Sequence, residues 1–137
     1  MRNVITLTYK HGLHCEAVCP DGQTLMPIDP ATHKGQPGCV FSPLDLLALA
    51  HGACTAMMLA KAADRLQLDV KGMQVEVSHE YDMGQAIRLA SARIRFVLPC
   101  RFDSEQEAEL RAGAGLCPVH TSLRPNIPVT MELVQPA

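Results

Sequence analysis

The 137-residue chain has no tryptophan, only two tyrosines and three phenylalanines, but it has seven methionines. A core with so few aromatic rings packs through flexible aliphatic side chains, and methionine suits pockets that accept elongated apolar ligands. The chain also lacks a run of Lys and Arg, and its formal net charge is −2 at pH 7. We therefore expect no nucleic-acid partner, because binding to phosphates needs a basic patch.

The N-terminal segment lacks the continuous apolar run of a secretory signal, since MRNVITLTYK alternates like a strand. The one long apolar segment is interrupted by His51 and Gly52 and ends in charged residues, so it predicts a core helix rather than a membrane span. With no signal expected, the six cysteines should be reduced thiols in the cytoplasm.

Residues 1–137 are expected to form a single domain, small enough that dimerisation would help to bury apolar surface. Alternation predicts three short strands within residues 2–28, the last two at 14–18 and 24–28 around a CPDG turn. Two prolines and two glycines in residues 29–41 predict a loop without regular structure.

Helix-start signals occur twice in the rest of the chain. Ser42, Pro43 and Asp45 form a capping box that predicts a helix to about Leu68. A second capping box in SEQE at 104–107 predicts a helix to about Gly115. The other predicted elements are strands at 71–82 and 87–98, a short helix from 118, and a strand at 129–134. The resulting order, βββ-α-ββ-α-α-β, defines an α+β fold.

Cys54 lies in the middle of the apolar helix, where the only polar side chains between Leu46 and Ala60 are His51, Cys54 and Thr55. A thiol in such a pocket supports redox chemistry if a second thiol can reach it. The alternative is a small buried hydrophobic residue. His51, one turn earlier on the same face, is the nearest local group that could assist the thiol. Alternatively, it is a core histidine bonded to a backbone carbonyl.

Cys117 is expected at or next to the cap of the short helix that Pro118 begins. There its sulfur would face free backbone N–H groups, which favour a thiolate and make it a good leaving or resolving thiol. His120, one turn on, could orient it or donate a proton. The alternative is a cysteine that only caps the helix.

A third group of residues has the ligand types for zinc: His11, His14, Cys15 and Cys19. It lies on a predicted strand and turn, where alternation sends side chains to both faces. We therefore expect no metal site there. Cys39 in the loop and Cys100 after a strand have no assigned role.

Two segments together resemble the OsmC/Ohr family, the osmotically inducible protein C and organic hydroperoxide resistance proteins. The matching residues are SPLDLLALAHGACTAM at 42–57, ADRL at 63–66 and CPVHTSL at 117–123. Asp29-Pro30 before the loop and the 63-residue separation of Cys54 and Cys117 also fit (117 − 54 = 63). The resemblance implies an OsmC-like fold and an intertwined homodimer, with N-terminal strands paired across subunits and central helices buried between the sheets.

The resemblance also implies a thiol-dependent peroxidase, an antioxidant oxidoreductase with peroxiredoxin activity in the oxidative stress response. Cys54 would attack an organic hydroperoxide and become a sulfenic acid, and Cys117 would then form a disulfide with it. An external dithiol would restore both thiols, and no metal, flavin or haem would be needed.

The chain departs from the family pattern at the residues that usually activate the thiolate. The peroxidase branches have an Arg in the N-terminal strand region and a Glu directly after the helix-opening proline. Here Leu44 follows Pro43, and no Arg occurs between Arg2 and Arg65. Lys10 and Asp45 are the remaining candidates to assist, and Asp45 is already expected in the cap. The sequence is closer to the OsmC-like branch that keeps both cysteines.

Three hypotheses follow. The first is a two-cysteine hydroperoxide reductase. The second is a non-catalytic dimer whose Met-lined pocket binds an apolar or thiol-containing small molecule. The third is a metal-dependent or storage role for the group that contains His11, His14, Cys15 and Cys19.

Overall fold

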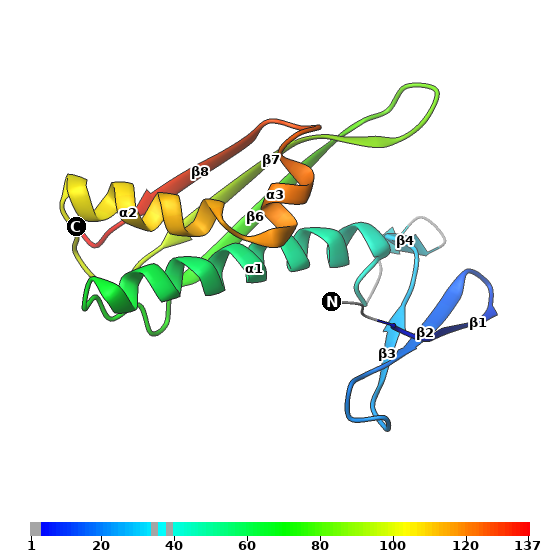
Figure 1. The fold of residues 1–137 in the computed structure, drawn as a ribbon. Helices are drawn as coiled ribbons and strands as arrows, with labels where there is room; N and C mark the ends of the chain where they lie inside the picture. The colour runs from blue at the N-terminus through cyan, green and yellow to red at the C-terminus, as the bar shows by residue number, and fades with distance from the viewer. Residues whose placement is uncertain (1–3, 34–35, 38–39) are drawn as a thin grey trace. The chain divides into compact units, whose positions relative to one another are not determined.

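The computed structural model describes residues 4–33, 36–37 and 40–137. Contacts divide the chain into two compact units, Met1–Leu47 and Ala48–Ala137. Each unit is described by itself below, and Figure 1 shows the elements of both. Whether residues 1–137 fold as one domain stays a prediction.

The first unit contains a three-stranded antiparallel sheet in the order β1-β2-β3. Its strands are β1 (Leu7–His11), β2 (His14–Val18) and β3 (Leu25–Ile28). The turn between β1 and β2 uses Gly12 and Leu13, both with positive φ (54° and 66°), as tight hairpins require. The Gly22 N–H donates to the Cys19 carbonyl (2.9 Å), which closes the expected turn. The three predicted strands are confirmed, although the first begins later than expected.

The expectation of a loop without regular structure at 29–41 was wrong in part. Two short strands, β4 (Thr32–His33) and β5 (Gln36–Pro37), pair antiparallel within it. Proline and glycine exclude a long central strand, but proline is tolerated on edge strands. A two-residue pairing therefore remains possible. Cys39 lies outside the described residues.

The second unit is built on a three-stranded sheet in the order β6-β7-β8. The strands β6 (Gln74–Asp82) and β7 (Arg88–Val97) form an antiparallel hairpin, and β8 (Val129–Val134) lies parallel to β7. A parallel pair needs a crossover connection. Here it is supplied by α2 (Ser104–Gly115) and α3 (Pro118–Leu123). These elements confirm the predicted α+β order, with β4 and β5 added.

Helix α1 (Pro43–Arg65) begins at the expected capping box. The Ser42 N–H donates to Asp45 Oδ2 (2.9 Å), and the Asp45 N–H donates to Ser42 Oγ (3.2 Å). The helix ends three residues earlier than predicted, because Gln67 adopts a left-handed conformation (φ 56°). The Leu68 N–H then donates to the Ala63 carbonyl (2.9 Å), which closes the helix end as in a Schellman motif.

The cap of α2 differs from the expected one. Asp103, not Ser104, is the N-cap, and its partner in the capping box is Gln106. Asp103 Oδ1 accepts from the Gln106 N–H (2.8 Å), and the Asp103 N–H donates to Gln106 Oε1 (2.9 Å). Asp103 with Gln106 and Ser104 with Glu107 both fit the capping-box pattern. Asp103 is favoured because a carboxylate at the N-cap also interacts favourably with the helix dipole.

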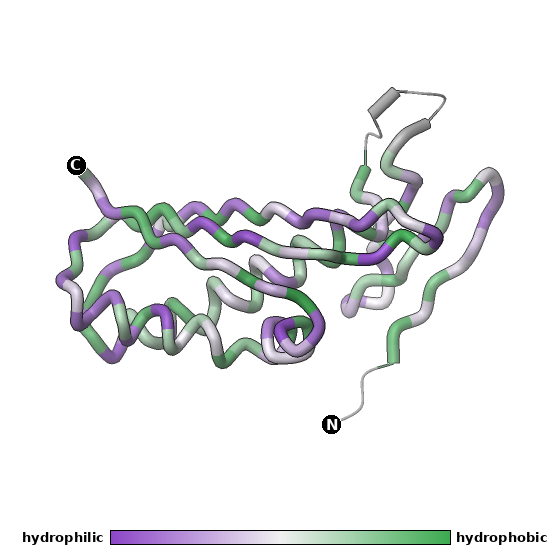
Figure 2. Tube along the Cα trace, turned by 90° about the horizontal axis from the view of Figure 1, so that it is seen from above, coloured by the Kyte–Doolittle hydropathy of each residue, from purple (hydrophilic) through white to green (hydrophobic). Residues whose placement is uncertain are grey.

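The helices cover one face of the β6-β7-β8 sheet, as the two views in Figures 1 and 2 agree. Residues of α1, β7 and α2 form the core between these layers, including Leu59, Phe96 and Leu110, each 0% exposed. Along β6, half-buried residues alternate with exposed ones. The opposite face of β6 is therefore polar and exposed within this chain.

Within the described residues, α1 alone is long and apolar enough to cross a membrane by length and composition. A core helix meets the same criterion. Leu59, Ala62 and Ala63 of α1 are buried in the core of the second unit, and the choice of a core helix over a membrane span stays a prediction.

Candidate active site

Gly52 allows α1 to approach β6 closely where the two elements form one side of the candidate site. A Cβ added at Gly52 would lie 2.5 Å from Val77 Cγ2 on β6. Real side chains are not this close, so the position favours glycine. His51, the residue before Gly52 on α1, is thus held near the inner face of β6, where it contacts His79.

The structure brings the two predicted cysteines together. The Cys54 thiol is a hydrogen-bonding partner of the Cys117 sulfur, although 63 residues separate them (117 − 54 = 63). Cys117 is 0% exposed, while Cys54 is only partly buried. Solvent and small molecules can therefore reach Cys54 more easily than Cys117.

Cys117 caps α3 as predicted, but its electrostatics were predicted wrongly. The His120 backbone N–H donates to Cys117 Sγ (3.3 Å), which favours the thiolate. Burial outweighs this contact, and together with the hydrogen bond that the Cys117 thiol donates to Cys54 it raises the pKa of Cys117 to about 11. Desolvation penalises the charged form, and a six-residue helix provides little opposing field. At neutral pH, Cys117 is therefore a protonated thiol.

Three histidines from three different elements meet beside the thiols. His51 of α1 lies between His79 of β6 and His120 of α3. His51 Nδ1 is 3.2 Å from His79 Nε2, and His51 Nε2 is 3.4 Å from His120 Nδ1. His51 is fully buried, and His120 is 5% exposed. We call these three residues the histidine chain.

Burial keeps the histidine chain neutral. Desolvation, followed by the neighbouring His79 and His120, lowers the pKa of His51 to about 4. Burial also lowers the pKa of His79 and, with a smaller contribution from the Arg124 cation, that of His120. His51 therefore does not act as a cation for Cys54 at neutral pH. The alternative of a carbonyl-bonded core histidine is also not observed, because both of its ring nitrogens contact other imidazoles.

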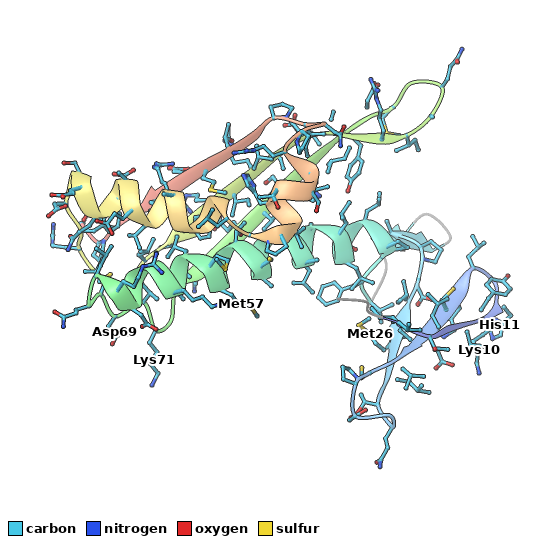
Figure 3. All side chains as sticks on the ribbon, viewed as in Figure 1. Lys10, His11, Met26, Met57, Asp69 and Lys71 are labelled. Atoms are coloured by element: carbon cyan, nitrogen blue, oxygen red, sulfur yellow. The ribbon has the colours of Figure 1, made fainter. Side chains whose placement is uncertain are left out.

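Lys10 and Asp45, the two other candidates to assist the Cys54 thiol, lie in the first unit, and each has a polar partner there. Lys10 Nζ pairs with Glu16 (3.3 Å), and Figure 3 shows Lys10 beside His11 near the end of β1. Asp45 accepts from the Ser42 hydroxyl (2.7 Å), and this bond lowers the pKa of Asp45. Asp45 thus has the capping role that the sequence assigned to it.

The group around His11 and His14 does not assemble into a metal site. Within the described ranges, no cluster of three or more His, Cys, Asp or Glu side chains could hold a metal ion. His14 Nδ1 instead contacts Asp29 Oδ1 (2.6 Å). The third hypothesis, a metal-dependent role, therefore gains no support from this part of the chain. Cys15, Cys19 and Cys100 are free thiols.

His79 is the site residue that sequence reasoning missed. It lies at the alternate positions of β6 that also hold Val75 and Val77, and these positions are the half-buried ones. A histidine on the inward face of an amphipathic strand is a signal for a buried polar contact, because such a ring needs a hydrogen-bonding partner. The partner itself, His51, is 28 residues away in sequence.

A sheet covered on one face by helices, with two interacting thiols from α1 and α3, defines an α+β protein with a candidate redox site. The OsmC-like protein family model matches residues 34–132, and the chain belongs to this family. A search of the curated proteins found no match.

Solved structures share the fold along nearly the whole chain. A protein from Psychrobacter arcticus 273-4, named for osmotic stress induction and detoxification, has a TM-score of 0.84 at 22% identity and covers 97% of this chain and 96% of its own. An OsmC-like protein from Mycoplasma pneumoniae has a TM-score of 0.80 at 17% identity, with 98% of both chains covered. An organic hydroperoxide resistance protein from Elizabethkingia anophelis has a TM-score of 0.77 at 16% identity, with 99% of both covered.

Proposed function

We propose that the protein is a cysteine-based peroxidase that reduces organic hydroperoxides. Cys54 sulfur attacks the terminal oxygen of the hydroperoxide, the O–O bond breaks, and the alcohol leaves with Cys54 oxidised to a sulfenic acid. Cys117 sulfur then attacks Cys54 sulfur, and the hydroxyl leaves as water when the disulfide forms. An external dithiol reduces the disulfide and regenerates both thiols.

The observation that carries this proposal is the contact between two thiols of unequal exposure. Cys54 is partly accessible, so it can meet a substrate, whereas Cys117 is 0% exposed and interacts with Cys54. This difference supports Cys54 as the peroxidatic residue and Cys117 as the resolving residue. Family membership and the hydroperoxide resistance proteins among the structural relatives support the same chemistry.

An exposed apolar stripe on α1 supports a homodimer. Leu49, Ala53 and Met57 follow one another at intervals of four residues, so they lie on one side of the helix. Leu49 is 50% exposed and Met57 is 66% exposed. Figure 3 shows Met57 on the side of α1 that faces away from the sheet. A second copy of the chain would cover this stripe and enclose an apolar cavity next to Cys54, which suits an apolar hydroperoxide.

The dimer can be tested at the stripe itself. Ala53→Glu places a charge in the proposed interface and should give a monomer in sedimentation equilibrium. Lys61→Glu is the matched control, because Lys61 is the next position along the same side of α1 and is already charged and exposed. A wild-type monomer at micromolar concentration would contradict the dimer.

The peroxidase is tested by thiol counting and peptide mapping. Cumene hydroperoxide added to the reduced protein should remove two thiols per chain and link the peptides that contain Cys54 and Cys117. Cys54→Ser should abolish peroxide consumption, and Cys117→Ser should leave a sulfenic acid that dimedone traps at residue 54. Cys19→Ser, in the turn after β2, is the control and should behave as wild type. Unchanged turnover in Cys54→Ser would refute the proposal.

A non-catalytic binding role is the second candidate. The pKa of Cys117, raised to about 11 by burial, favours a thiol that stays protonated. In this case the apolar surface beside Cys54 would hold an apolar or thiol-containing small molecule. Native mass spectrometry that finds a bound ligand, together with thiols inert to hydroperoxide, would support this role over catalysis.

A further inference from the structure

A groove of the second unit lies between α2, α3 and β8, apart from the two thiols. Its volume is about 480 Å³, which is in the range of pockets that hold small molecules. The lining combines polar and apolar side chains, among them Arg111, His120, Arg124, Leu116, Val129 and Met131. We call it the arginine groove.

The charge of Arg111 is already neutralised within the protein. Its Nε and Nη2 donate to Glu107 Oε1 (3.0 and 2.7 Å), and its Nη1 donates to the Met131 carbonyl. Two opposite charges in contact largely cancel each other's field at a distance. Arg111 therefore forms a wall of the groove, and the net charge of the groove depends on its other residues.

Arg124 provides that net charge. It is exposed at the C-terminal end of α3, and within the described part of the chain it forms no ion pair. Its charge acts on His120, because burial first and the Arg124 cation second lower the pKa of that ring. A guanidinium has five N–H donors in a planar fork, and without a counter-ion it favours the binding of a carboxylate.

His120 provides a second polar group beside Arg124. Its ring is 5% exposed, and its Nδ1 lies 3.4 Å from His51 Nε2. Its Nε2 has no hydrogen-bond partner among the residues that the structure describes. Buried polar atoms are normally paired, so this nitrogen is available to a ligand. When His51 donates to Nδ1, the neutral ring carries its own proton on Nε2 and can donate it to an anion.

The rest of the lining suits an aliphatic chain. Leu116 is 66% exposed, and Val129 and Met131 are half-buried. An exposed leucine by itself needs no explanation, but here three apolar side chains share a groove with an unpaired cation. One cation beside a neutral ring matches a single negative charge. A phosphate dianion would need a second cation, and Arg111 already has a partner.

We propose that the arginine groove is a binding site for an aliphatic carboxylate. The carboxylate accepts from the Arg124 guanidinium and from His120 Nε2–H, and the aliphatic chain covers the apolar lining. The site does not depend on the proposed peroxidase, because neither thiol has to react. It is nevertheless close to the resolving thiol, since the His120 backbone N–H donates to Cys117 Sγ.

Octanoate is the probe for this site, and calorimetric titration of the reduced 137-residue protein measures its binding. Affinity should rise from acetate through hexanoate to octanoate, by about fourfold for each methylene that becomes buried. Octylammonium has the same chain and the opposite charge, and it should not bind. Equal affinities for acetate and octanoate, or tighter binding of octyl phosphate, would overturn the assignment to an aliphatic carboxylate.

Two variants locate the ligand. Arg124→Gln removes the cation and should weaken octanoate binding by about tenfold. Gly115→Leu should also weaken it, because Gly115 lines the groove and a Cβ there meets nothing within 4 Å. Arg93→Gln is the matched control and should bind as wild type, since Arg93 is an exposed arginine of β7 outside the groove. Wild-type affinity in Arg124→Gln would overturn the proposal.

The His120 ring gives a readout that a general loss of affinity would not change. Because the Arg124 cation lowers the pKa of His120, Arg124→Gln alone should raise this pKa. Octanoate bound to the wild type should raise it as well, since the carboxylate neutralises the guanidinium. Imidazole ¹H–¹³C spectra recorded across pH measure both effects, and the signals of His11 in the first unit are the internal control. If octanoate binds but leaves the His120 signals unchanged, the ligand lies elsewhere and the proposal fails.

Discussion

Replacing Gly52 by alanine should loosen the contact between α1 and β6 on which the site depends. The added Cβ would lie 2.5 Å from Val77 Cγ2, whereas carbon atoms in contact prefer about 3.5–4.0 Å. One of the two groups must therefore move by about 1 Å. Overpacking of this kind costs about 1–3 kcal/mol, and alanine in place of a helical glycine returns about 1 kcal/mol. We expect a net loss of about 1 kcal/mol in the free energy of unfolding.

The same displacement affects the histidine chain. The His51–His79 link is 3.2 Å long, and a shift of about 1 Å takes it beyond hydrogen-bonding distance. The imidazole ¹⁵N shifts of both residues should therefore change in Gly52→Ala. Stability is measured by urea unfolding followed by far-UV circular dichroism, because the chain has no tryptophan.

A double-mutant cycle isolates the cause. Val77→Ala removes the obstructing methyl groups, so in the double variant alanine at 52 should be less harmful than in the wild-type background, with a coupling of about 1 kcal/mol. Gly115→Ala is the control, since a Cβ there meets nothing within 4 Å. The reasoning is refuted if Gly52→Ala is more stable than wild type, couples to Val77→Ala by nearly zero and leaves the histidine spectra unchanged.

Three further predictions concern individual groups. Because the pKa of His51 is lowered to about 4 from 6.5, the unfolded chain binds a proton that the folded chain excludes. Stability should therefore fall as the pH drops from 6.5 to 4, by about 3 kcal/mol in total, and His51→Gln should flatten this part of the urea-derived profile. Cys117 is buried and its pKa is raised to about 11, so it should resist iodoacetamide at pH 7.5 in the native protein and react only after unfolding. Peptide mass spectrometry measures this labelling, and rapid labelling of native Cys117 would contradict the prediction. Asp103→Ala should lower the free energy of unfolding by about 1 kcal/mol, because it removes the N-cap of α2. Ser104→Ala should change it by less than about 0.5 kcal/mol, and equal losses in the two variants would argue against Asp103 as the cap.

Local signals in the sequence were sufficient for most of the secondary structure. The Ser42–Asp45 capping box and Pro118 correctly marked the starts of α1 and α3, and β8 (Val129–Val134) lies where alternation placed it. These signals work because capping bonds and strand periodicity depend on residues only a few positions apart. Where two local patterns overlapped, as at Asp103 and Ser104, the sequence did not decide between them.

The site required the tertiary structure. The sequence determined that two cysteines and two histidines lie at fixed positions on α1 and α3, and the family resemblance pointed to the thiol pair. Only the packing of α1, β6 and α3 brings the sulfurs into contact and adds His79 to the chain. The predicted thiolate character of Cys117 was reversed for the same reason. A helix cap is a local feature, whereas the desolvation that raises the pKa of Cys117 depends on every element packed around the sulfur.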